Sequence, residues 1–155
     1  MVPEETTTIP LPTGAVLASF WRRGGGLAID QVVAAVIPFS VALMVADTAK
    51  QTVSGATGFW VNVSLVAIGL LHETVGVWRW GRTLGKLVTG TRVVHAVDGG
   101  RVSLSAAFLR SLVPAAFGVI PGIGVLLGLC VYMWAFIDPR RQGVHDKAAA
   151  TLVVR

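Results

Sequence analysis

The sequence predicts an all-α membrane protein: a four-helix transmembrane bundle with a small cytoplasmic β-hairpin. The chain has 155 residues, of which 54% are hydrophobic and only 14% are charged. That is too little charge to cover the surface of a soluble domain of this size. The apolar residues form long runs, as expected for helices in lipid, and the basic residues cluster at the ends of these runs.

The net charge of +5 does not indicate a nucleic-acid-binding protein. A nucleic-acid interface would need a basic groove with interleaved aromatic residues, whereas these charges flank apolar segments. We therefore expect membrane lipid as the counter-charge, and no nucleic acid as a partner. The basic positions at membrane ends, predicted to contact lipid headgroups, are Arg79, Arg82, Lys86, Arg140 and Arg141.

Residues 1–18 are predicted to be a disordered cytoplasmic tail, and residues 19–155 the transmembrane domain. The tail is acidic and rich in Pro and Thr, and it lacks the basic start of a signal peptide. Two long apolar runs follow, at about 24–46 and 59–80, and each is long enough to span the hydrocarbon core. The linker between them holds one acid and one base, so we place it outside.

The basic segment after the second run is predicted to be cytoplasmic and to contain a β-hairpin at about 91–104. Its β-branched residues flank Asp98-Gly99-Gly100, and glycine supplies the positive φ that a tight turn needs. The final TLVV has the same character, so it is a candidate third strand.

The last apolar stretch is predicted to be a short helical hairpin, with helices at about 104–120 and 123–137. Basic segments flank it on both sides, so an even number of crossings must separate them. The break is expected at Pro121-Gly122, because proline stops a helix and glycine permits a sharp turn. Both chain termini are then cytoplasmic. Each arm is only about 25 Å long by helical rise, so the hairpin is either re-entrant or thins the bilayer.

Three ordered segments resemble the RDD family of membrane proteins: FWRRGGGLAID, WGRTLGKLVTGTRVVHAVDGGRVSL and FIDPRRQGVHDKAAATLVV. By position, the name-giving arginine is Arg23, with Arg22 as its neighbour. The first aspartate is Asp30, and the second is Asp138 or Asp146. A departure is the run of three glycines after Arg23, which leaves the first helix turn loose or closely packed. The resemblance implies a multi-pass membrane protein, but no particular activity.

Three predicted spans carry an ionisable side chain at about the same depth, roughly 10 Å from the inner end by helical rise. These are Asp30, Glu73 and Arg110. Charges in hydrocarbon need partners, so we expect a buried layer in which Arg110 bridges both carboxylates. One interpretation is a structural clasp between three helices. The other is a proton-sharing site, since two acids face one base. We favour the clasp.

We expect no enzyme, no cofactor and no metal site. The segment GRTLGK lacks the Ser or Thr that follows the lysine of a phosphate-binding loop. His145 and Asp146 are adjacent in the sequence, which is a poor spacing for one metal ion, and no nucleophile is near them. A local ion pair or a helix-end interaction is the default for Asp138, and contact with Arg23 is the alternative.

The leading functional hypothesis is a non-catalytic accessory or assembly subunit of a larger membrane complex, with other integral membrane subunits as partners. Its motivation is size, because four short helices are expected to enclose no substrate pocket of ordinary volume. The alternative is a small proton-coupled cation transporter that acts as a homo-oligomer, with Asp30 and Glu73 as ion ligands. A third hypothesis is a lipid-binding protein that uses the basic loops.

Overall fold

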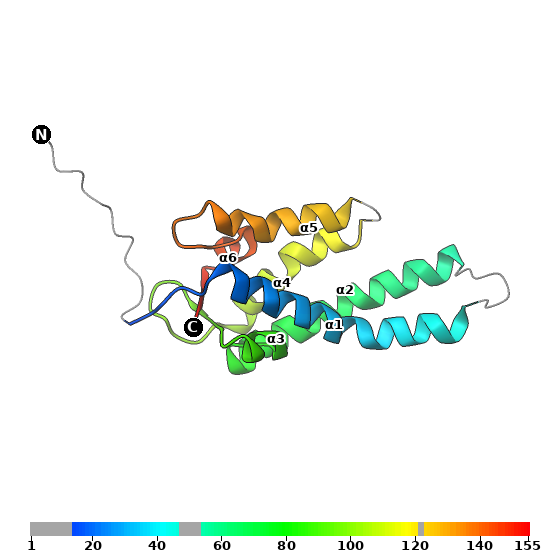
Figure 1. Cartoon of the computed structure of the whole chain (residues 1–155), viewed down its shortest axis with the longest axis horizontal. Helices are drawn as coiled ribbons and strands as arrows, with labels where there is room; N and C mark the ends of the chain where they lie inside the picture. The colour runs from blue at the N-terminus through cyan, green and yellow to red at the C-terminus, as the bar shows by residue number, and fades with distance from the viewer. Residues whose placement is uncertain (1–13, 47–53, 121–122) are drawn as a thin grey trace, which may run out of the picture.

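The computed structural model describes residues 14–46, 54–120 and 123–155. The chain is mostly helical, and its longest elements are the antiparallel helices α1 (Phe20–Val45) and α2 (Gly55–Trp80). Two shorter helices, α4 (Leu104–Gly118) and α5 (Gly124–Met133), form a second hairpin beside them (Figure 1). The predicted break at Pro121-Gly122 and the first part of the predicted tail lie outside the described residues.

Helix starts follow the sequence closely. Ser19, Ser54, Thr83 and Ser103 are the N-caps of four helices, and each accepts a hydrogen bond from a backbone N–H in the first turn. A side-chain oxygen at this position satisfies a donor that has no partner inside the helix. The cap at Ser19 starts α1 earlier than the predicted residue 24. Gly81 ends α2 in the left-handed conformation, with φ of 70°.

The remaining elements lie at one end of the helices, and together we call them the cap. They are α3 (Leu84–Val88), β1 (Arg92–His95), the 3₁₀ helix η1 (Trp134–Phe136), α6 (Val144–Ala148) and β2 (Thr151–Val154). β1 and β2 pair antiparallel, from Arg92 opposite Val154 to His95 opposite Thr151. The start of α1 and the C-terminus lie at this same end (Figure 1).

The predicted hairpin at 91–104 is wrong in its second arm. The turn forms, because His95 N–H donates to Gly100 O and Gly99 has φ of 69°. The chain after the turn is not a strand, however, and Val102 enters the core instead. The partner of β1 is the C-terminal TLVV, all four residues of which are buried. Burial favours β2, because all of its residues are buried, whereas Arg101 and Ser103 on either side of Val102 are exposed.

The last residues of the predicted tail are also part of this cap. Leu17 forms a bridge with Val154, and the N–H of Ala18 donates to Val153 O. Ala18 is fully buried, in a cluster with Val77, Val93, Val102, Ala107 and Val153. The ordered cap therefore starts before α1, and it joins both ends of the domain.

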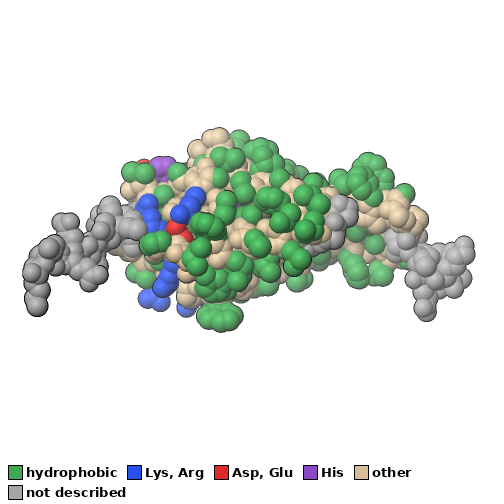
Figure 2. Space-filling view, turned by 90° about the horizontal axis from the view of Figure 1, so that it is seen from above, with side chains coloured by type: hydrophobic (Ala, Val, Ile, Leu, Met, Phe, Trp, Pro, Cys, Tyr) green, Lys and Arg blue, Asp and Glu red, His purple; other side chains and the backbone are tan. Residues whose placement is uncertain are grey.

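Apolar side chains cover most of the outer surface of the helices. Figure 2 shows hydrophobic side chains over much of the visible face, with Lys and Arg gathered near one end. On α1, Val32, Ile37 and Leu43 are more than 60% exposed. Phe20–Met44 and Gly55–Trp80 are long and apolar enough to cross a membrane, whereas the apolar helices Leu104–Gly118 and Leu126–Phe136 are shorter.

Candidate functional site

The most deeply buried charged group is the carboxylate of Asp146 on α6. Oδ1 accepts from Nη1 of Arg110 on α4 at 2.6 Å, and Oδ2 accepts from Nη2 of Arg23 on α1. The backbone N–H of Gly143 also donates to Oδ2, at 3.0 Å. Asp146 is 0% exposed and Arg110 is 2% exposed. One side chain therefore joins three helices that are far apart in the sequence.

Glu73 on α2 forms the second part of the cluster. Its Oε1 lies 3.1 Å from Nζ of Lys86 on α3 and 3.6 Å from Nε of Arg110. Arg110 thus lies between two carboxylates, those of Glu73 and Asp146. The guanidinium of Arg110 therefore connects α2, in the hairpin of the two long helices, with α6 in the cap.

Asp30 on α1 forms the third part. It accepts a hydrogen bond from the hydroxyl of Thr83, and its Oδ1 accepts from the N–H of Gly85 at 2.8 Å. Nζ of Lys86 lies 3.7 Å from Oδ2. The glycine is required here, because a Cβ on Gly85 would lie 2.0 Å from the carbonyl oxygen of Gly26. The predicted glycine run is thus closely packed at Gly26, while Gly24 faces open space.

The charges of this cluster balance. Three carboxylates, Asp30, Glu73 and Asp146, are matched by Arg23, Lys86 and Arg110. Burial alone would raise the pKa of the Asp146 carboxyl, but the neighbouring guanidiniums of Arg110 and Arg23 lower that pKa well below its usual range.

His145, beside this cluster, is buried and packs against Tyr132, with ring centroids 4.4 Å apart and ring planes tilted by 54°. Neither ring nitrogen makes a hydrogen bond within the described part of the chain. Burial lowers the pKa of the His145 imidazole from 6.5 to about 4, because a charged imidazolium is poorly solvated there. At neutral pH the imidazole is therefore uncharged, and it leaves the charge balance of the cluster unchanged.

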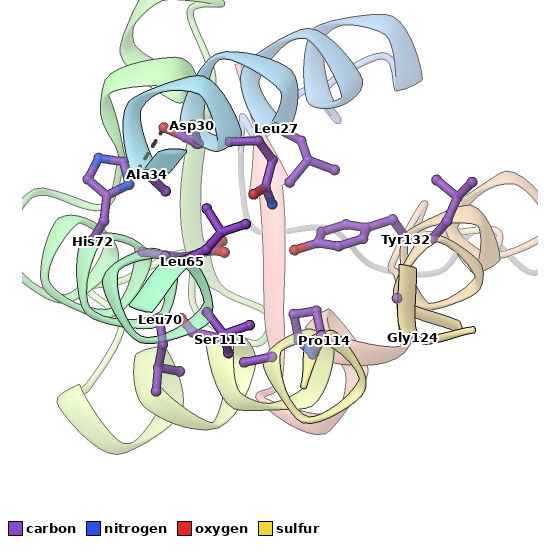
Figure 3. A pocket seen from close by; sticks show the side chains of 18 of the residues that line it. Leu27, Asp30, Ala34, Leu65, Leu70, His72, Ser111, Pro114, Gly124 and Tyr132 are labelled. Atoms are coloured by element: carbon purple, nitrogen blue, oxygen red, sulfur yellow. Dashed lines mark ion pairs between the residues drawn. The ribbon is translucent and has the colours of Figure 1, made fainter. Parts of the chain in front are cut away.

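A cavity of about 450 Å³ lies next to the cluster, between α1, α2, α4 and α5. Figure 3 shows its lining: Asp30 and His72 lie on one side, Tyr132 points inward from α5, and Leu65 and Pro114 supply apolar walls. His72 Nδ1 lies 3.9 Å from Oδ1 of Asp30. This volume lies in the range of small-molecule pockets, roughly 300–1,000 Å³. The expectation that the helices enclose no pocket of ordinary volume is wrong.

A sequence model of the RDD family matches residues 17–150. The chain belongs to the RDD family. Proteins of this family are membrane proteins, in agreement with the two long apolar helices. No curated protein and no solved structure matches the chain.

In this RDD protein, the arginines and aspartates that carry the family resemblance have different partners. Arg23 pairs with Asp146, whereas Arg22 donates to the carbonyl oxygen of Thr89 at the surface. Asp30 lies apart from that pair, against α3. Asp138 does not contact Arg23: it accepts from the N–H groups of Arg140 and Gln142 and pairs with Lys147. The alternative contact between Asp138 and Arg23 is therefore wrong, and Asp146 is the aspartate that Arg23 binds.

Two further predictions need correction. Arg110 contacts Glu73, but its second carboxylate is that of Asp146, and Asp30 pairs with Lys86 instead. Lys86, predicted to contact lipid headgroups, turns inward, and its side chain is only 11% exposed. The reason is the short helix α3, which folds back on α1 and carries Lys86 to the two carboxylates.

The other predicted headgroup residues remain closer to the surface. Arg79 and Arg141 are exposed, and Arg82 and Arg140 are half-buried. Arg140 also donates to the carbonyl oxygen of Ala96 in the cap, at 2.8 Å. The described residues contain no group of three or more His, Cys, Asp or Glu side chains that could hold a metal ion.

Sequence reasoning missed Lys86, Tyr132 and His145 as parts of this region. Lys86 follows Glu73 only after the sharp turn at Gly81, so no helical spacing relates the two residues. His145 and Tyr132 meet because the chain reverses between η1 and α6. The sequence gives one signal for Tyr132. It is the only tyrosine in the sequence, and it lies in a strongly apolar segment.

Proposed function

We propose that this RDD protein is a non-catalytic integral membrane protein that acts as an accessory or assembly subunit of a larger membrane complex. The observation that carries the proposal is the charge-balanced cluster. Each of its carboxylates has a cationic partner, and its members come from α1, α2, α3, α4 and α6. Buried ion pairs of this kind more often specify how helices pack than move a solute.

The proposed arrangement in the membrane has four crossings, by α1, α2, α4 and α5, with both termini in the cytoplasm. In its support, the outward ends of both helical hairpins lie away from the cap, and the basic side chains gather near the cap (Figures 1 and 2). Basic residues favour the cytoplasmic side. Arg79, Arg82, Arg140 and Arg141 are then positioned to contact anionic headgroups.

Topology is testable by cysteine labelling in a Cys130→Ala background. Single cysteines at Thr7 and Arg155 should both react with a membrane-impermeant maleimide only after the membrane is opened. Reaction of one of them in intact cells would show an odd number of crossings and contradict the four-helix arrangement.

The accessory function is testable in native membranes. A tagged chain should co-purify with a much larger membrane assembly, and deletion of the protein should weaken that assembly on native gels. Re-expression of the wild-type chain is the control and should restore the assembly. Migration as an isolated small protein, with no effect of deletion on any larger complex, would contradict the proposal.

A second candidate function, a small proton-coupled cation transporter acting as a homo-oligomer, is favoured by the cavity. Asp30, His72 and Glu73 all line it, and carboxylates inside a membrane often mark ion pathways. Purified protein in liposomes should then dissipate a cation or pH gradient. Asp30→Asn should abolish this flux while the protein stays folded, because an amide cannot exchange a proton. An absence of flux from pure wild-type protein would exclude this candidate.

A further inference from the structure

The cavity beside the cluster has room for a ligand with an apolar chain. Most of the surface that lines it is apolar, and Leu27, Leu65, Val66 and Leu129 contribute to this surface. Glycines widen it: a Cβ added at Gly69 or Gly128 would meet its nearest neighbour only at 3.9 or 4.0 Å. At these distances a Cβ makes an ordinary van der Waals contact, and since both glycines line the cavity, a larger side chain at either position would take up part of its volume.

The cavity is less closed between α1 and α5 than at its other sides. α1 packs on α2, α2 on α4 and α4 on α5, whereas α1 and α5 have few contacts with each other. In the proposed arrangement the bilayer surrounds this side, because α1 is a candidate membrane span and α5 lies in a shorter apolar helical segment. A lipid chain can thus enter sideways, without crossing a polar surface.

Two polar atoms of residues that line the cavity have no hydrogen-bond partner in the described part of the chain. Within the described residues, Glu73 uses Oε1 for Lys86 and Arg110, and neither its Oε2 nor the hydroxyl of Tyr132 makes a hydrogen bond. Tyr132 points into the cavity in Figure 3. A carboxylate oxygen accepts hydrogen bonds, and a tyrosine hydroxyl both accepts and donates. Together they suit a ligand that carries a hydroxyl group.

Charge selects a neutral ligand over a cationic or an anionic one. The cluster already holds three carboxylates and three cations, so any charged head would leave an unmatched charge in a region of low polarity. We propose that the cavity is a binding site for a single-chain lipid alcohol, with its hydroxyl at Glu73 and Tyr132 and its chain among the aliphatic side chains. This site goes beyond the accessory function and rests only on the proposed arrangement of the helices in the membrane.

The head, rather than the chain, determines affinity at such a site. Lipid tails are as apolar as leucine, so moving a chain from the bilayer into the cavity gains little. The hydroxyl of a lipid alcohol exchanges its hydrogen bonds at the bilayer surface for those to Glu73 and Tyr132, whereas an alkane would leave both of these polar groups without a partner. An alkane of the same length should therefore compete poorly, whereas an alcohol should compete well.

The test uses the full-length protein in vesicles of phosphatidylethanolamine and phosphatidylglycerol, with a hexadecanol that carries a diazirine in mid-chain. After illumination, mass spectrometry should place the label on α1, α2 or α5 residues that line the cavity. Unlabelled hexadecanol should reduce labelling, and hexadecane and hexadecylammonium should do so much less. Gly128→Leu should abolish cavity labelling, and its matched control Gly58→Leu should not, since Gly58 has no neighbour within 4 Å.

If Gly128→Leu does not fold, Tyr132→Phe still tests the proposal, because this change removes one oxygen and keeps the ring. Loss of one hydrogen bond should weaken hexadecanol competition about three- to tenfold. Equal labelling of Gly128→Leu and Gly58→Leu would overturn the proposal, as would an unchanged Tyr132→Phe. Stronger competition by hexadecylammonium would assign the cavity to cations instead, and crosslinks to another polypeptide would assign it to a partner helix.

Discussion

Asp146 and Asp30, two of the buried aspartates of this RDD protein, are stabilised in different ways. Asp146 receives two guanidinium groups, from α1 and α4, and it is fully enclosed. Asp30 receives a hydroxyl and a backbone N–H from the start of α3, and its nearest cation is 3.7 Å away. Asp146 depends on charges, and Asp30 depends mainly on hydrogen bonds.

This difference indicates separate structural roles. Removing the charge of Asp146 would leave two arginines in a buried site, and arginine cannot lose its proton there. The amide of an asparagine at position 30 could still accept the hydrogen bond from Gly85. Asp146 therefore connects the cap to the helices, whereas Asp30 positions α3 against α1.

The largest effect is expected from Asp146→Asn. Breaking a buried ion pair by neutralising one partner costs about 3–5 kcal/mol, and here two guanidiniums lose their partner. Folded yield after size-exclusion chromatography in detergent, and the midpoint of thermal unfolding, should both fall sharply. Asp138→Asn is the matched control with a smaller expected loss, because the side chain of its partner Lys147 is 47% exposed and water weakens this ion pair. Equal losses for the two variants would remove the special role of Asp146.

The next effect concerns pH and His145. The pKa of this imidazole is about 4 in the folded protein and 6.5 in the unfolded chain, so only the unfolded chain takes up the proton between these values. Stability should therefore fall as pH decreases from 6.5 towards 4. Thermal unfolding of the wild type between pH 7.5 and pH 5 should show this decrease.

The variant His145→Phe removes the titrating group and keeps a ring against Tyr132. Its unfolding midpoint should change less over the same pH interval. Asp138 and Asp146 do not interfere, because the pKa values of both are lowered from 3.8 and their contribution to stability is lost only at more acidic pH. Parallel pH profiles for the variant and the wild type would contradict this origin of the pH dependence.

A smaller effect is expected from Asp30→Asn, of about 1–2 kcal/mol, since the amide retains an acceptor for Gly85 and loses only part of the interaction with Thr83 and Lys86. The unfolding midpoint of this variant should lie between those of the wild type and Asp146→Asn. A loss as large as that of Asp146→Asn would show that the charge at position 30 matters as much as the one at position 146.

The smallest effect is expected from Asp98→Asn. The carboxylate of Asp98 is exposed, and it accepts hydrogen bonds from the turn at Gly100 and from His95. These contacts lower its pKa, but water screens them. The unfolding midpoint should match that of the wild type within error. A clear decrease would show that the turn contributes to the stability of the cap.

The predicted parts of the fold are those that depend on local patterns. The long apolar runs and the Asp98-Gly99 turn need only neighbouring residues, and both are present in the structure. The second arm of the hairpin failed because β1 and β2 pair across the whole second half of the chain. Helices α3 and α6 have five residues each, too short for their periodicity to stand out in a sequence.

For the candidate site, sequence alone determined that Asp30, Glu73 and Arg110 need buried partners, because isolated charges on apolar helices are costly. It also determined the RDD resemblance, and so the membrane environment. Only the tertiary structure decided the pairing: Arg110 with Asp146 and Glu73, Arg23 with Asp146, and Lys86 with Asp30 and Glu73. The position of a charge along its helix sets its distance from the helix end, but its partners depend on how the helices rotate and how the chain folds back. Those are set by packing between segments distant in sequence.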